Sequence, residues 1–282
     1  MKFTKQSSNH ILSHLYEHLF FIHLDTTLRE KDLYPIIDYS IDAYTTDGRV
    51  VFDIETYRDI DIEECIAQAN HEFLTIKELT DIAIAQLEAE YTCSMAIKDT
   101  QILEENLTKL NETPWNTDST VQIPNEIISK GGEVPLYILT LTAAFNNLPA
   151  KIRPLHRLIA GVTIDVAVSD IADTFGGFVR SKTFTTSAQK DLIGEVQLKE
   201  SVPRAELTML IDETKHELQS SGAYARLVAD LSDTKTMMHA PSQKRTFEDT
   251  GITMDDNKWK ELATNENLKS ITDQLVLEIN IS

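Results

Sequence analysis

Residues 10–22 read His-Ile-Leu-Ser-His-Leu-Tyr-Glu-His-Leu-Phe-Phe-Ile, and this stretch decides how the rest of the sequence is interpreted. Its leucines recur at three- and four-residue intervals, at Leu12, Leu15 and Leu19. That spacing places them on one face of a helix. Asn9 or Ser8 stands where the side chain that caps such a helix is expected. The stretch therefore predicts an amphipathic helix that begins near His10.

The same helix carries three side chains that can perform chemistry. His14 and His18 are one turn apart, and Glu17 follows His14 by three residues, so all three share a face. Two imidazoles at this spacing can bind one tetrahedral ion, and hydrolytic zinc sites use three protein ligands with a nearby carboxylate that takes a proton from water. This is the H-x-x-E-H arrangement of the inverzincins. A chance pair of histidines on an ordinary helix face is the alternative.

A third ligand is expected from another helix. Residues 61–72 and 76–97 lack Gly and Pro and are rich in helix-forming residues, which predicts two helices. The second offers Glu88 and Glu90. Glu90 shares a face with the apolar side chains of Leu79, Ala83 and Leu87. A carboxylate on a buried face needs a cation or a hydrogen-bond partner, so Glu90 is preferred as the ligand, and Glu88 is expected to be solvated.

The remaining sequence predicts an α+β fold with two related halves. Residues 42–56 contain a Thr-Thr-Asp-Gly turn followed by the period-two alternation of a strand. Residues 111–135 are rich in turn-forming residues and are interpreted as a linker. Further strands are expected after Gly177, a helix at 204–220 and a mostly helical tail at 254–281. We therefore expect a metal-binding half at 1–128 and a second half without metal ligands at 129–282.

Composition narrows the function classes. The 282 residues include 26 Lys and Arg against 45 Asp and Glu, a net charge of −19, which argues against nucleic-acid binding. Residues 1–141 carry 25 acidic and 10 basic side chains, so a net charge of −15 lies in the part with the proposed metal site. Glycine-rich phosphate loops are absent from the sequence. An acidic cavity that attracts a cation or basic peptides is one interpretation, and a solvated surface is the other.

The location of the protein is predicted from what the sequence lacks. Two cysteines, Cys65 and Cys93, are too few for a disulfide framework, and the first ten residues do not contain the apolar run of a secretory signal. No stretch is long and apolar enough for a membrane-spanning helix. We therefore expect a cytoplasmic protein that does not associate with a membrane.

These residues resemble a known family of zinc metallopeptidases, which includes pitrilysin, insulin-degrading enzyme and the mitochondrial processing peptidase. The likeness is carried by His14-x-x-Glu17-His18 followed by Leu-Phe-Phe, by residues 41–45 (Ile-Asp-Ala-Tyr-Thr), and by Glu90, which follows His18 at a spacing close to that of the family's glutamate ligand. It covers residues 10–95 well and 134–200 faintly. The resemblance implies a pitrilysin-like clamshell whose halves are mostly antiparallel sheets with helices on one face. It also implies Zn²⁺ on His14, His18 and Glu90, and a peptide bound as an added strand.

The sequence departs from the family pattern at several positions. A glutamate common seven residues before the ligand is replaced by Ala83, and residues 171–179 lack the Arg and Tyr that often grip substrate. The two halves can be aligned by matching residues 44–46 (Tyr-Thr-Thr) with residues 184–186 (Phe-Thr-Thr). This alignment pairs the motif with residues that do not form a metal site, at Pro154, Arg157 and Leu158.

The predicted function is hydrolysis of short or unfolded peptides by a zinc endopeptidase in which Glu17 is the general base. The alternative is a catalytically weak or inactive relative that binds peptides or serves as a regulatory subunit. Such a relative would act with an active partner subunit. Pairing of two copies of the chain as a homodimer is a separate possibility that the sequence leaves open. In either case the expected partner is a peptide, basic if the acidic side chains line the site.

Overall fold

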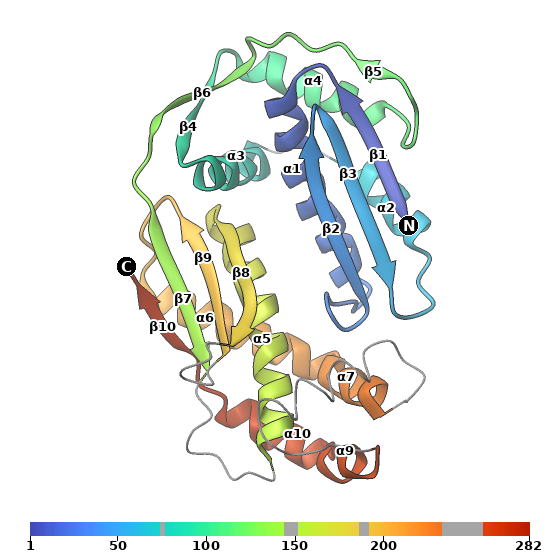
Figure 1. Cartoon of the computed structure of the whole chain (residues 1–282), viewed down its shortest axis with the longest axis vertical. Helices are drawn as coiled ribbons and strands as arrows, with labels where there is room; N and C mark the ends of the chain where they lie inside the picture. Colours follow the sequence, from blue (N-terminus) through green and yellow to red (C-terminus); the bar gives the residue numbers. More distant parts are fainter. Residues whose placement is uncertain (74–76, 144–151, 186–191, 233–255) are drawn as a thin grey trace. The chain divides into compact units, whose positions relative to one another are not determined.

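The computed structural model describes residues 1–73, 77–143, 152–185, 192–232 and 256–282, and these residues form two compact units (Figure 1). The first unit comprises Met1–Tyr137, Ala172–Phe178 and Gln197–Ser201, and the second comprises Ile138–Ile171, Val179–Val196 and Val202–Ser282. These units are defined by contacts between residues. The predicted halves 1–128 and 129–282 follow sequence order and stay a prediction.

The first unit contains a four-stranded sheet with the order β2-β3-β1-β5. Its strands are β1 (Lys2–Ser7), β2 (Tyr39–Thr46), β3 (Arg49–Thr56) and β5 (Thr120–Val121). The β2–β3 hairpin turns at Asp47 and Gly48, which both adopt positive φ, as such two-residue turns require. The pairs β1–β3 and β2–β3 are antiparallel, and β1–β5 is parallel. The strand and turn predicted within 42–56 are confirmed.

Helix α1 (His10–Arg29) is the central element of this unit and packs against the sheet. It begins as predicted, because the side chain of Asn9 accepts a hydrogen bond from the backbone N–H of Leu12 and caps the helix. It continues beyond the predicted end, because Leu24 and Leu28 are buried in the core and no glycine or proline interrupts this stretch. A helix buried on most of its sides suits a core position.

Three further helices surround α1: α2 (Ile62–Glu72), α3 (Lys77–Tyr91) and α4 (Thr100–Glu112). The prediction of one helix over 76–97 is wrong at its C-terminal end. Thr92 adopts a left-handed conformation with φ of 57°, which ends α3, and Cys93–Ile97 forms strand β4, paired antiparallel with β6 (Ile128–Glu133). The predicted linker at 111–135 therefore contains the end of α4 and two short strands, β5 and β6.

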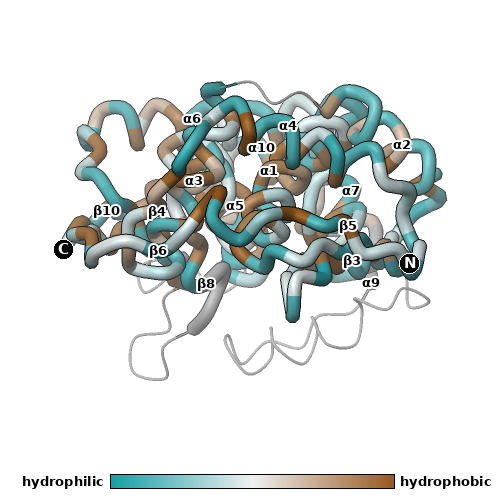
Figure 2. The backbone as a smooth tube through the Cα atoms, turned by 90° about the horizontal axis from the view of Figure 1, so that it is seen from above, coloured by the Kyte–Doolittle hydropathy of each residue, from teal (hydrophilic) through white to brown (hydrophobic). Residues whose placement is uncertain are grey.

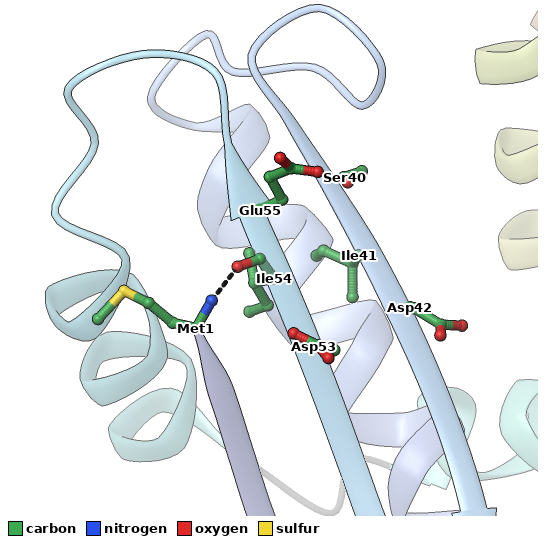
Figure 3. A pocket seen from close by; sticks show the side chains of 7 residues that line it. All are labelled: Met1, Ser40, Ile41, Asp42, Asp53, Ile54 and Glu55. Carbon is green, nitrogen blue, oxygen red and sulfur yellow. Dashed lines mark hydrogen bonds between the residues drawn. The ribbon is translucent and has the colours of Figure 1, made fainter. Parts of the chain in front are cut away.

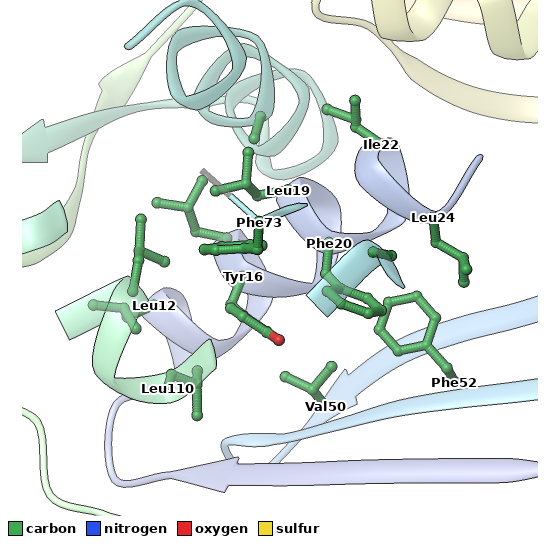
Figure 4. Close-up of a cluster of buried hydrophobic side chains, with 14 of the residues drawn as sticks. Leu12, Tyr16, Leu19, Phe20, Ile22, Leu24, Val50, Phe52, Phe73 and Leu110 are labelled. Atoms are coloured by element: carbon green, nitrogen blue, oxygen red, sulfur yellow. The ribbon is translucent and has the colours of Figure 1, made fainter. Parts of the chain in front are cut away.

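The core of the first unit gathers around the buried face of α1 (Figure 4). Tyr16 and Phe20 stack with ring centroids 5.7 Å apart, and Phe20 meets Phe52 of β3 edge to face. Lys5 is also buried there, with its Nζ donating to the backbone carbonyl oxygens of Leu110 and Asn111 at the end of α4. The apolar face of α1 and the sheet thus fix the orientation of the helix that carries the H-x-x-E-H motif.

The second unit has a four-stranded sheet with the order β10-β7-β9-β8. Its strands are β7 (Tyr137–Ala143), β8 (Phe178–Thr185), β9 (Leu192–Leu198) and β10 (Glu278–Ile281), and its helices are α5 (Arg153–Phe175), α6 (Arg204–Ser220), α7 (Ala223–Ser232), α9 (Asp256–Leu262) and α10 (Asn265–Gln274). The end of α5, from Ala172 onward, belongs to the first unit. Helix α6 contains both hydrophilic and hydrophobic residues (Figure 2). The helix predicted at 204–220 is confirmed. The tail is helical only to Gln274, because its last residues pair with β7 as an antiparallel strand.

Both units therefore combine helices with sheets whose described pairings are mostly antiparallel, and the α+β class is confirmed. No helix within the described residues is both long enough and apolar enough to span a membrane.

Candidate metal centre

One turn of α1 brings the motif side chains to a common place. His14 and Glu17 are buried, and the ring centroids of His14 and His18 lie 5.0 Å apart. His14 Nε2 is 3.9 Å from Glu17 Oε2. The predicted helix face is thus present, and the backbone of a single rigid helix fixes the spacing of all three groups.

Glu90, near the end of α3, completes the cluster. Its Oε2 lies 3.2 Å from His14 Nε2 and 3.1 Å from His18 Nε2. Nitrogen and oxygen atoms that bind one zinc ion tetrahedrally lie about 2.1 Å from the ion. Any two of these ligand atoms are then about 3.4 Å apart. The two measured separations are close to that value, so this donor set of two imidazoles and one carboxylate fits the protein ligands of a catalytic zinc site. The structure thus brings together the three residues that the sequence predicted as ligands.

Glu88 is placed differently from the sequence expectation. It is buried rather than solvated, because it accepts a hydrogen bond from the backbone N–H of Met95 at 2.7 Å and pairs with Lys199. Both partners come from segments after α3, which residue periodicity alone does not locate. Glu90 is the more exposed of the two, with its side chain 26% exposed. Glu88 therefore anchors α3, and its carboxylate does not belong to the His14–His18 cluster.

Both imidazoles are also held through their second nitrogen by residues of α3. His18 Nδ1 lies 3.0 Å from Gln86 Oε1, and His14 Nδ1 lies 2.7 Å from the hydroxyl oxygen of Tyr91. That hydroxyl group is also 3.4 Å from His10 Nε2. The Nε2 atoms are thereby turned toward Glu90. The sequence does not predict the contacts of Gln86 and Tyr91, although Gln86 lies one turn before Glu90, at the four-residue spacing that places two side chains on one helix face.

The electrostatics of the cluster follow from burial and from these contacts. Burial disfavours the charged form of Glu90, but its hydrogen bonds with His14 and His18 outweigh burial and lower its pKa to about 2. Burial also opposes a charge on His18, yet the hydrogen bond to Glu90 raises the pKa of His18 above its ordinary value. Without a metal, these contacts favour the charged forms of Glu90 and of His18, and a divalent cation would take the place of the proton between them.

Glu17 has a different environment from Glu90. Burial raises the pKa of Glu17 above its ordinary value. The hydroxyl group of Thr45, on β2, opposes that rise, because it donates a 2.7 Å hydrogen bond to Glu17 Oε2. A carboxyl group with a raised pKa can exchange a proton with water near neutral pH more readily than an ordinary glutamate. Thr45 lies in the segment that carried the family resemblance, but its contact with Glu17 depends on how the hairpin packs against α1.

A separate pocket of about 420 Å³ lies on the hairpin (Figure 3). Its lining combines the N-terminus with side chains of β2 and β3: Met1, Ser40, Ile41, Asp42, Asp53, Ile54 and Glu55. His14, Glu17, His18 and Glu90 do not line it. Its carboxylates make this part of the hairpin acidic, in agreement with the charge distribution of the sequence.

The described residues of the C-terminal half contribute no second cluster of this kind. Among the residues that the structure describes, His14, His18 and Glu90 form the single group of three metal-ligating side chains. Pro154, Arg157 and Leu158, which the alignment of the two halves pairs with the motif, lie on α5.

Comparisons with known proteins place the chain beside peptidase structures at low similarity. No family model matches the sequence, and no curated protein matches it. The ferredoxin protease FusC, in complex with Arabidopsis ferredoxin, is 13% identical with a TM-score of 0.29, covering 99% of this chain and 42% of that chain. Pitrilysin is 10% identical with a TM-score of 0.33, covering 100% and 40%. The peptidase M16 inactive domain from Pseudomonas fluorescens is 8% identical with a TM-score of 0.30, covering 99% and 91%.

This chain thus spans about two fifths of the length of FusC and of pitrilysin. Similarities at these identities and TM-scores give no evidence of function. Evidence for the function comes from the geometry of the metal centre.

Proposed function

We propose that the protein is a zinc-dependent endopeptidase that hydrolyses short or unfolded peptides. The observation that carries this proposal is the convergence of His14 Nε2, His18 Nε2 and Glu90 Oε2 beside the carboxylate of Glu17. Two imidazoles and one carboxylate are the ligand set of several zinc hydrolases, which leave one coordination position for water or substrate.

The protein side chains have distinct roles in this proposal. His14, His18 and Glu90 would hold Zn²⁺, which when bound supplies a Lewis acid for the scissile carbonyl and for water. Glu17 accepts a proton from the attacking water and delivers it to the leaving amine. Thr45 keeps the Glu17 carboxylate oriented, because its hydroxyl group donates to Oε2.

The hairpin offers a place for an extended peptide. Strand β2 is at the end of the strand order β2-β3-β1-β5, and none of the described strands pairs with its outer side. Its residue Thr45 touches Glu17, so a peptide that pairs with β2 would pass the metal centre. Asp42 projects from the same strand and lines the acidic pocket of the hairpin. This edge therefore favours peptides with basic side chains.

The test is a pair of variants assayed for zinc content and for cleavage of an unfolded polypeptide such as reduced casein. Glu17→Gln is expected to bind one zinc per chain and to lose cleavage by at least about 100-fold, the contribution of a general base. His18→Ala is expected to lose both. Chelator-sensitive cleavage by the parent protein would support the proposal. Stoichiometric zinc without cleavage would overturn it in favour of the peptide-binding or regulatory alternative, and parental cleavage by Glu17→Gln would exclude the role of Glu17.

A further inference from the structure

We infer that Gln86 is a positioning residue, which holds the Nδ1 proton of His18 and thereby leaves Nε2 as the atom that binds the metal. This inference rests on the proposed function for its consequence, zinc affinity, but its structural part concerns the hydrogen bond of His18 alone. Gln86 is buried, with 4% of its surface exposed, and its side-chain amide contacts His18 on one side and the end of α5 on the other.

The orientation of the Gln86 amide follows from its partners on α5. Its Nε2 lies 2.9 Å from Asp173 Oδ1 and 3.3 Å from the backbone carbonyl oxygen of Ala172. A backbone carbonyl and an ionised carboxylate can only accept hydrogen bonds. The NH₂ group must therefore face α5, and Oε1 must face His18. Because Oε1 can only accept, the hydrogen between it and His18 belongs to Nδ1.

This arrangement determines how His18 can use its other nitrogen. In the metal-free protein Nε2 can also carry a proton and donate it to Glu90, 3.1 Å away. A metal ion that displaces this proton finds the imidazole already oriented, with its Nδ1 proton retained by Gln86. Partners of this kind fix the tautomer and orientation of a ligating histidine, and their loss typically weakens metal binding by about 10- to 100-fold.

The C-terminal end of α5 packs closely against α3. Gly176 adopts a φ of +68°, and the N–H of Gly177 donates to the Ala172 carbonyl oxygen, which is the hydrogen bond of a Schellman cap. A Cβ added to Gly176 would lie 2.4 Å from the Cβ of Ala85, one residue before Gln86. This close approach brings Asp173 and the Ala172 carbonyl within reach of the Gln86 amide.

The test measures zinc affinity by chelator competition and the His18 Nδ1–H signal by NMR of protein labelled with ¹⁵N-histidine. Gln86→Leu is expected to weaken zinc binding by about 10- to 100-fold and to remove the hydrogen-bonded, slowly exchanging Nδ1–H signal. The double variant Gln86→Glu with Asp173→Asn keeps both hydrogen bonds. The amide now at position 173 donates to the carboxylate now at position 86, and that carboxylate still accepts from Nδ1 of His18. The double variant is expected to restore the signal and to keep zinc affinity within about threefold of the parent.

The matched control is Gln197→Leu. Gln197 is a half-buried glutamine whose Nε2 donates to the Ala89 carbonyl oxygen, so it also anchors α3 but does not contact His18. The control should leave both readouts unchanged. Equal losses in Gln86→Leu and Gln197→Leu, or a persistent Nδ1–H signal in Gln86→Leu, would overturn the inference. If the parent protein binds no zinc, the proposed function fails, and the Nδ1–H signal of parent and variants still decides the role of Gln86.

Discussion

The hydroxyl group of Thr45 donates a 2.7 Å hydrogen bond to Oε2 of Glu17 and so joins the edge strand β2 to the helix that carries the metal-binding motif. The bond stabilises the ionised carboxylate, whereas the burial of Glu17 destabilises it. The two effects on the pKa of Glu17 have opposite signs, and the charges of His14, His18 and Glu90 add to them.

Thr45→Val removes this hydrogen bond while keeping the shape of the side chain, so the pKa of Glu17 should rise further. A general base works only when deprotonated, and the acidic limb of kcat/KM against pH should therefore move to higher pH, by about one unit. The control is Thr46→Val, the next residue of β2, which is exposed. A Thr45→Val profile that coincides with the parent profile would show that the bond does not affect the base.

Gly176→Ala should destabilise the first unit and weaken the metal centre together. The left-handed backbone conformation alone costs an alanine about 1 kcal/mol relative to glycine. The new methyl group would also meet the Cβ of Ala85. Gly222→Ala is the matched control, since Gly222 has a similar φ of +72° but open space around it. Thermal unfolding should give a larger loss for Gly176→Ala than for Gly222→Ala, and equal losses would mean that α3 and α5 do not need this close approach.

Because the carboxylate of Glu88 is buried, its ion pair with Lys199 should contribute more to the free energy of unfolding than a surface ion pair does. Among the described residues, Lys199→Met leaves that carboxylate with the backbone N–H of Met95 as its remaining partner. The substitution should lower the free energy of unfolding by about 2 kcal/mol, less than the loss of a fully buried pair, because Lys199 is partly exposed. The exposed pair Lys98–Glu126 provides the control, and Lys98→Met should leave stability unchanged within error. Urea titrations of the two variants compare them directly, and identical midpoints would contradict the prediction.

Metal removal should be visible as a loss of thermal stability. A ligand that binds only the folded chain at 100 times its Kd stabilises it by about 2.7 kcal/mol. Zinc should therefore raise Tm in the parent protein, and a chelator should reverse the rise. Glu90→Gln replaces a charged ligand by a neutral amide and should abolish most of the zinc-dependent increment. An increment of parental size in that variant would remove Glu90 from the ligand set.

Sequence periodicity located the elements that contain the motif better than the elements around them. The leucine spacing and Asn9 predicted where α1 begins, because helix capping and an apolar face are local properties of the chain. The break of α3 at Thr92 was missed, because a left-handed threonine followed by a strand that pairs with residues 128–133 is stabilised by long-range contacts. Glu88 was predicted to be solvated because its partners, Lys199 and the backbone N–H of Met95, come from segments after α3. In the structure Glu88 is buried.

The sequence by itself determined the chemistry of the motif. The intervals between His14, Glu17 and His18 bring their side chains together on any straight helix, since about 3.6 residues complete one turn. Only the tertiary structure decided which carboxylate joins them and what orients the imidazoles. Glu90, Gln86 and Tyr91 reach the two histidines from a second helix, and Asp173 reaches Gln86 from a segment much later in the chain. Contacts between segments so distant in sequence depend on how the helices pack. The spacing of residues within one segment does not determine that packing.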